Sequence, residues 1–127
     1  MDLLSRATFF HRARAAAERY VALPFIFRHE NQLLEGEIDL AFTEDDAWVV
    51  AALHDVPLLP DQQVEHEVKR LAWQAVALEQ LTGRPVKELV IVNVQTQHEQ
   101  AFIWSEALRL QLLLPFMILP HSGGATP

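Results

Sequence analysis

Two short apolar runs separated by a helical segment constrain the fold more than any other feature of this sequence. Trp48–Leu53 reads WVVAAL and Glu88–Val94 reads ELVIVNV, and such runs are typical of strands buried on both faces. Between them, Val64–Leu81 carries apolar residues at helical spacing, and the following TGRP supplies the glycine and proline that commonly end a helix. A strand, a helix and a strand joined by short connections predict a parallel pair with a right-handed crossover.

The residues before this unit predict a helix and a three-stranded meander. Ser5–Tyr20 is rich in alanine and arginine and lacks glycine and proline, so we expect a helix that Pro24 closes. Phe25–Glu30 and Leu33–Phe42 combine β-branched and aromatic residues with partial alternation, and we expect a hairpin that turns at HENQ. A second turn at TEDDA then leads into the strand WVVAAL.

The remaining segments predict a loop and a further helix. Asp55–Gln63 contains two prolines and is expected to be a loop, whereas Glu99–Leu114 is helical in composition and is broken by Pro115. The predicted order is therefore helix, three-strand meander, helix, strand, helix. This order defines an α/β fold with a mixed sheet flanked by helices, and at 127 residues the chain is expected to be a single domain.

Charge and composition exclude several classes of function. The formal charge of −7 and the pI near 5.2 argue against strong autonomous binding to a phosphate backbone, which depends on lysine and arginine. With no cysteine, the chain has no disulfides, thiolate metal sites or cysteine nucleophile. No apolar run approaches the roughly 18 residues of a membrane span, and we expect a cytoplasmic location.

Four segments follow one another in an order that is found in a known family. They are Pro24-Phe25, Glu35–Phe42 (EGEIDLAF), Trp48–Ala51 (WVVA) and Ala75–Val86 (AVALEQLTGRPV). Together they resemble the nuclease domain of the PD-(D/E)xK superfamily, in the form found at the C-terminus of AddA- and RecB-type helicase–nucleases. The resemblance runs from about Glu18 to Val94. It implies a restriction-endonuclease-like core over residues 1–120, truncated on the N-terminal side.

The resemblance also implies a metal site, most of whose residues are replaced here. In the family, an aspartate on one strand and an acidic residue and a lysine on the next strand hold a divalent metal and activate water, as phosphodiester hydrolysis requires. Asp39 matches the aspartate, but Ala52 stands in place of the second carboxylate and His54 in place of the lysine. Arg70 aligns with a glutamine at the start of the next helix, and Gln74 with an aromatic residue. The family's upstream helix with a histidine or glutamate ligand is not expected in its usual place.

These replacements lead to three interpretations. The first is a degenerate nuclease-fold domain without a cofactor, which serves as a structural or interaction module in DNA repair or recombination and has DNA or a helicase–nuclease protein as partner. The second is an active DNA nuclease with a displaced site, in which Asp39 and His54 are catalytic and Glu37, Asp39 and His54 bind Mg²⁺ or Mn²⁺. The third is a protein-binding module with no DNA role. A structural role for Asp39, as a hydrogen-bonding residue of the sheet, is also open.

The C-terminal region is unusually apolar. Leu108–Leu119 is too apolar for an exposed tail, so we expect it to cover the sheet, within the chain or across a homodimer interface. Residues 121–127 are expected to be disordered. Trp48 and Trp73 are expected to pack in the core.

Overall fold

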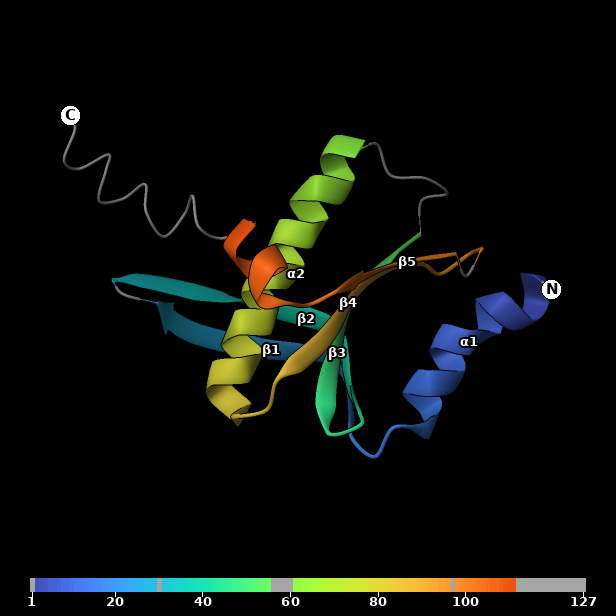
Figure 1. Cartoon of the computed structure of the whole chain (residues 1–127), viewed down its shortest axis with the longest axis horizontal. Helices are drawn as coiled ribbons and strands as arrows, with labels where there is room; N and C mark the ends of the chain where they lie inside the picture. Colours follow the sequence, from blue (N-terminus) through green and yellow to red (C-terminus); the bar gives the residue numbers. More distant parts are fainter. Residues whose placement is uncertain (1, 30, 56–60, 97, 112–127) are drawn as a thin grey trace.

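The chain folds into an α/β structure built on one five-stranded mixed sheet (Figure 1). The computed structural model describes residues 2–29, 31–55, 61–96 and 98–111. The elements are helix α1 (Asp2–Ala15), strands β1 (Arg19–His29), β2 (Gln32–Glu44) and β3 (Ala47–His54), helix α2 (Asp61–Thr82), and strands β4 (Val86–Asn93) and β5 (Glu99–Ile103). The strands lie side by side in the order β1-β2-β3-β4-β5. Only β3 and β4 are parallel, and the other neighbours are antiparallel.

The predicted strand–helix–strand unit is confirmed. β3 and β4 pair in parallel from Val49–Glu88 to His54–Asn93, and α2 connects them. α2 ends at Thr82, and Gly83 follows with a φ of 76° in the left-handed region that favours glycine. The N–H of Gly83 donates to the carbonyl of Glu79 at 2.9 Å, which satisfies one of the last carbonyls of the helix.

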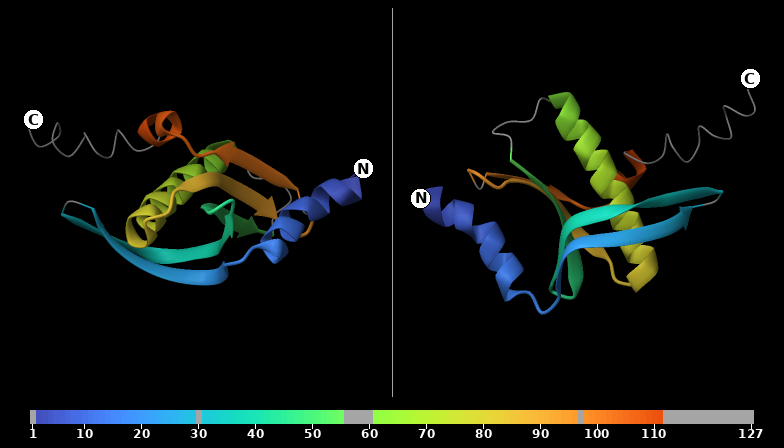
Figure 2. Two further views of the ribbon diagram at one scale, coloured as in Figure 1. Left: turned by 60° about the horizontal axis from the view of Figure 1, so that its bottom comes forward. Right: turned by 180° about the vertical axis from the view of Figure 1, so that it is seen from behind.

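The two helices cover opposite faces of the sheet (Figure 2). On one face, α2 buries an apolar cluster that includes Leu71, Ala75, Leu78, Trp48, Val50 and Ala52. On the other face, α1 closes a smaller cluster that includes Phe9, Ala13, Phe42, Val49 and Val90. β3 is therefore buried on both sides, as the unbroken apolar run of its sequence predicts.

The β1–β2 hairpin projects beyond the rest of the sheet (Figure 1). β2 pairs with β3 only from Leu40 to Glu44, whereas its earlier residues pair with β1 alone. Gly36 lies opposite Phe25, and a Cβ atom at position 36 would stand 3.4 Å from the phenylalanine ring. The predicted meander, with turns near HENQ and TEDDA, is confirmed.

The prediction for the N-terminal segment is wrong at its end. α1 ends at Ala15 rather than Tyr20, because Arg19 and Tyr20 pair with Phe42 and Ala41 as the first residues of β1. Pro24 does not close the helix and lies inside β1, opposite Glu37. A proline is tolerated there because β1 is an edge strand, where an N–H can be missing without loss of a ladder hydrogen bond.

Two further predictions are corrected on the C-terminal side. α2 begins at Asp61, so the last three residues of the predicted loop Asp55–Gln63 are helical. Glu99–Ile103 forms β5 instead of a helix, because it pairs with the free edge of β4. Among the described residues of the predicted helix Glu99–Leu114, residues 106–111 are helical. Of the apolar segment Leu108–Leu119, Leu108 packs against the cluster under α2. Leu110 in the same segment is 43% exposed, and residues 112–119 and the tail 121–127 lie outside the described residues.

No described helix is long and apolar enough to cross a membrane.

A charged cluster fastens α1 to the sheet. The Arg12 guanidinium donates to both carboxylate oxygens of Glu44 at 2.8 and 2.7 Å and to Glu88 at 2.6 Å. Lys87 donates to the same Glu44 carboxylate at 2.9 Å. These hydrogen bonds, above all that from Arg12, lower the pKa of Glu44 to about 2. The cluster therefore joins α1 to β2 and β4.

Glu44 should make stability depend on pH in the acid range. Its carboxyl titrates near 4.5 in the unfolded chain and near 2 in the folded one, so it stabilises the fold above pH 4.5 and loses this effect as the pH falls toward 2. Glu44→Gln should lower the free energy of unfolding at pH 6 by about 1–2 kcal/mol. The free energy of unfolding of this variant should also fall less steeply below pH 4.5 than that of the unsubstituted protein, as measured by urea unfolding at several pH values. Glu35→Gln, at an exposed position of the hairpin, is the control and should leave the decline unchanged.

Glycine in the β2–β3 turn should make the protein more stable than the aspartates that are present there. Asp45 and Asp46 have φ values of 54° and 64°, the pattern of a two-residue type I′ turn. Asp46→Gly should raise the free energy of unfolding by about 0.5–1 kcal/mol, because the left-handed conformation is unfavourable for residues with a Cβ atom. Asp46→Ala keeps that Cβ atom and should not stabilise the protein. Equal stability of both variants in thermal unfolding would contradict the prediction.

Candidate functional site

Asp39 lies where β2 separates from β3. The last pair between the two strands is Leu40–Ala51, and β3 continues alone beside β4 as far as His54. Beyond this point the N–H of Leu53 has no main-chain acceptor on β2, and it donates to Oδ2 of Asp39 at 2.9 Å. The Asp39 carboxylate thus takes the place of the main-chain carbonyl that β2 would otherwise supply as acceptor.

β2 bends at the same residue. The β1–β2 register passes from Val21–Leu40 to Leu23–Ile38, and between these pairs Ala22 has a φ of 53°. Leu40 packs in the cluster under α1, whereas Ile38, two residues earlier, packs in the cluster under α2. Side chains two apart on a regular strand share a face, so the strand turns over between them. Asp39 is at this bend.

Four polar side chains from three elements form a chain of contacts beside the bend. Nη2 of Arg70 on α2 lies 4.0 Å from Oδ2 of Asp39. The Arg70 guanidinium also donates to Glu67, one turn earlier on α2, with N–O distances of 2.8–3.3 Å. Oε1 of Glu67 lies 3.7 Å from Nε2 of His54 at the end of β3. That nitrogen is buried and makes no hydrogen bond to any residue that the structure describes. Asp39 and His54 are therefore linked through Arg70 and Glu67.

The other residues singled out from the sequence have structural surroundings. Ala52 is fully buried in the apolar cluster under α2. Gln74 is 3% exposed, and its amide nitrogen donates to the main-chain carbonyl of Glu37 at 3.3 Å. Glu37 itself is exposed. Trp48 packs in the core as predicted, and Trp73 is partly buried against the same cluster.

This set of residues does not fit the divalent metal that the family resemblance implies. Magnesium needs several hard oxygen ligands, and the side chain of Ala52 has no oxygen. The Asp39 oxygen nearest to Arg70 already accepts the hydrogen bond from Leu53. Within the part of the chain that the structure describes, no group of three or more histidine, aspartate or glutamate side chains is placed to hold a metal ion. The displaced site of Glu37, Asp39 and His54, and the catalytic roles of Asp39 and His54, remain predictions.

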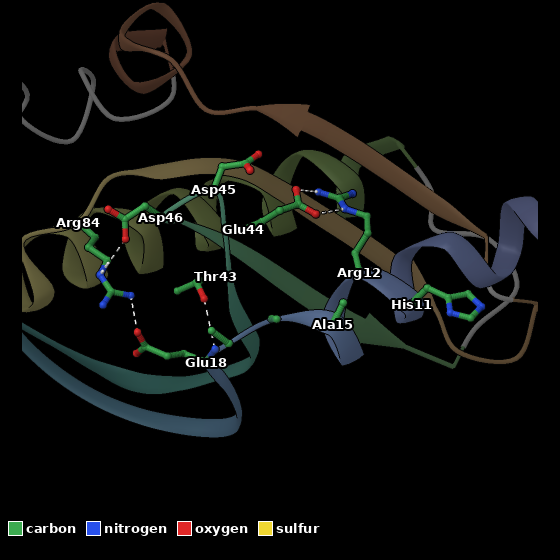
Figure 3. A pocket seen from close by; sticks show the side chains of 11 residues that line it. His11, Arg12, Ala15, Glu18, Thr43, Glu44, Asp45, Asp46 and Arg84 are labelled. Atoms are coloured by element: carbon green, nitrogen blue, oxygen red, sulfur yellow. Dashed lines mark hydrogen bonds and ion pairs between the residues drawn. The ribbon is translucent and has the colours of Figure 1, made fainter.

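A pocket of about 580 Å³ lies at the other end of these strands, between α1 and the β2–β3 turn (Figure 3). Its guanidinium groups are already paired, Arg12 with Glu44 and Arg84 with Glu18 at 2.6 Å. Asp46 also lies 3.9 Å from Arg84. Both arginines that line the pocket therefore already have carboxylate partners. None of the residues predicted for the metal site lines it.

Two features of the site were not predicted from the sequence. Glu67 was not singled out, although its spacing of three residues from Arg70 on a helix is a recognisable ion-pair signal. Nothing in the sequence indicates the positive φ of Ala22, because alanine is not a residue that favours this conformation.

Comparison with known proteins gives one link to a function. The sequence matches no protein-family model. It is similar to an ATP-dependent helicase/nuclease subunit of the AddA type from Clostridium novyi strain NT, with 34% identity over 88 residues. The match covers 65% of this chain but 7% of the relative's length. The similarity supports a link between the chain and helicase/nuclease proteins of this kind.

The hydrogen bond of Asp39 can be separated from its charge by two substitutions. Asp39→Ala leaves the Leu53 N–H without its acceptor and should lower the free energy of unfolding by about 1–2 kcal/mol. Asp39→Asn keeps an acceptor oxygen in the same place and should cost less than about half of that. Urea unfolding of both variants measures the difference. Equal losses would show that the carboxylate charge, and not the hydrogen bond, matters for stability.

Proposed function

We propose that this chain is a degenerate PD-(D/E)xK nuclease-fold domain, related to the nuclease part of AddA- and RecB-type helicase–nucleases. It does not hydrolyse nucleic acid, and it acts in the cytoplasm as a structural or interaction module in DNA repair or recombination. The similarity to a helicase/nuclease protein of the AddA type supports this relationship. The five-stranded mixed sheet, with three antiparallel strands followed by a helix and a parallel strand, is compatible with a restriction-endonuclease-like core.

The burial of Ala52 is the observation that carries the non-catalytic proposal. The resemblance places the second metal-binding carboxylate at this position, and the methyl group there is fully buried among apolar side chains. A metal that generates hydroxide from water must be held by its protein ligands and must have an open coordination position. Asp39 alone, hydrogen-bonded to Leu53, does not meet this requirement. We therefore propose that the domain uses no metal cofactor.

The charge of the chain bears on its partner. Ten lysine and arginine residues stand against seventeen aspartate and glutamate residues, so a protein surface is a better partner than a phosphate backbone. We propose a helicase or nuclease protein as that partner. The same charge favours a second candidate function, a protein-binding module with no role on DNA.

A nuclease assay tests the proposal. Linear single- and double-stranded DNA should remain intact with Mg²⁺ or Mn²⁺ and the unsubstituted protein. The matched variant is Asp39→Asn, because it removes the metal-binding charge and keeps an acceptor for Leu53. Cleavage by the unsubstituted protein that is lost in this variant would mean that an active site exists around Asp39, and the proposal would be wrong. Cleavage that is the same in both would point to a contaminant.

DNA binding separates the two candidate functions. Fluorescence anisotropy of labelled DNA at about 20 mM salt detects even weak phosphate contacts, because such binding is strongest at low salt. Binding that weakens steeply toward physiological salt would favour a module that works on DNA. Its complete absence at low salt would favour the protein-binding module.

A further inference from the structure

We propose that Arg70 is the resident cation of this site. Its guanidinium lies between Asp39 and Glu67, where it supplies the positive charge that a metal would otherwise bring, and it keeps divalent ions out. This inference rests on the proposed function and deepens it, because it gives a physical reason for the loss of metal binding beyond the loss of one ligand.

The geometry around Arg70 is that of a shared counter-ion. Nη2 donates to Oε1 of Glu67 at 2.8 Å and lies 4.0 Å from Oδ2 of Asp39, so one nitrogen faces two carboxylates from different elements. Nε donates to the same Glu67 carboxylate, which fixes the plane of the guanidinium. Glu67 is 14% exposed and Asp39 31%, so both charges are partly removed from water.

The balance of charge explains why such a cation is needed. Without Arg70, the carboxylates of Asp39 and Glu67 would lose the cation that lies near both of them, beside the imidazole of His54. Two partly buried like charges repel, and a divalent ion would relieve the repulsion. As the structure stands, these three side chains are not placed to hold a metal ion, so they would have to close around one where the guanidinium now lies. Two carboxylate oxygens and an imidazole nitrogen form a mixed donor set that suits Mn²⁺ or a later transition metal better than Mg²⁺. With Arg70 in place, the ion would have to displace a guanidinium that is hydrogen-bonded to both oxygens of Glu67.

The test compares two substitutions of Arg70 that differ in charge. Arg70→Gln removes the cation and keeps a polar side chain, whereas Arg70→Lys keeps a positive charge. Thermal unfolding is measured in about 10 mM MnCl₂ and in NaCl of equal ionic strength, and bound Mn²⁺ is counted by electron paramagnetic resonance. We expect Mn²⁺ to raise the melting temperature of Arg70→Gln by about 4 °C or more. The unsubstituted protein should have the same melting temperature in MnCl₂ as in NaCl, and so should Arg70→Lys. The double variant Arg70→Gln/Asp39→Asn, which lacks one carboxylate, should lose the response.

Each outcome bears on the inference. If Arg70→Gln is unfolded without metal and folds when Mn²⁺ is added, the inference is supported. If it ignores Mn²⁺, stays unfolded with it, or responds no more than Arg70→Lys does, the inference is wrong. In those cases the proposed function still stands, since it depends on the absence of DNA cleavage by the unsubstituted protein. Stoichiometric Mn²⁺ binding by the unsubstituted protein would overturn the inference directly.

Discussion

The burial of β3 on both faces is the constraint on which the rest of this structure depends. α2 covers one face and α1 the other, and the residues Val49 to Ala52 are fully buried between them. A charge in this stretch would be taken out of water without a partner, at a cost of several kcal/mol. The charged groups of the central strands are therefore found at the two ends of this buried stretch. Glu44 lies at the β2–β3 turn, Asp39 lies just beyond the last β2–β3 pair, and His54 ends β3.

This constraint gives Ala52 a physical meaning. A carboxylate at position 52 would sit in the apolar cluster under α2, and a bound cation would be needed to compensate its charge. When no cation is bound, alanine is the residue that suits the position, because it fills the space without a polar group. Stability and metal-dependent chemistry therefore favour different residues here. Alanine at position 52 and a positive charge on Arg70 both leave the site neutral enough to fold without metal.

The parts of the fold that could be predicted from the sequence are those in which local pattern and tertiary pairing agree. The β3–α2–β4 unit is of this kind, since its strands are buried and its helix has one apolar face. The predictions for two segments are wrong because strand pairing outweighed the helical preference of the local sequence. Glu99–Ile103 is helical in composition but lies at the free edge of β4, where hydrogen bonds are available to a strand. Arg19 and Tyr20 likewise leave the predicted helix because β2 offers partners in Phe42 and Ala41.

The site was less predictable because it joins residues that are far apart in the sequence. Asp39, His54 and Arg70 were singled out through a family pattern, and the signal for Glu67 was its spacing of three residues from Arg70 on α2. The pattern also assigns Asp39 to metal binding, whereas the structure gives it a hydrogen bond to Leu53 at the point where two strands part. Such a bond would favour aspartate at this position even in a chain that never binds a metal. Asp39 on its own is therefore poor support for nuclease activity, and the proposed function depends on the residues around it.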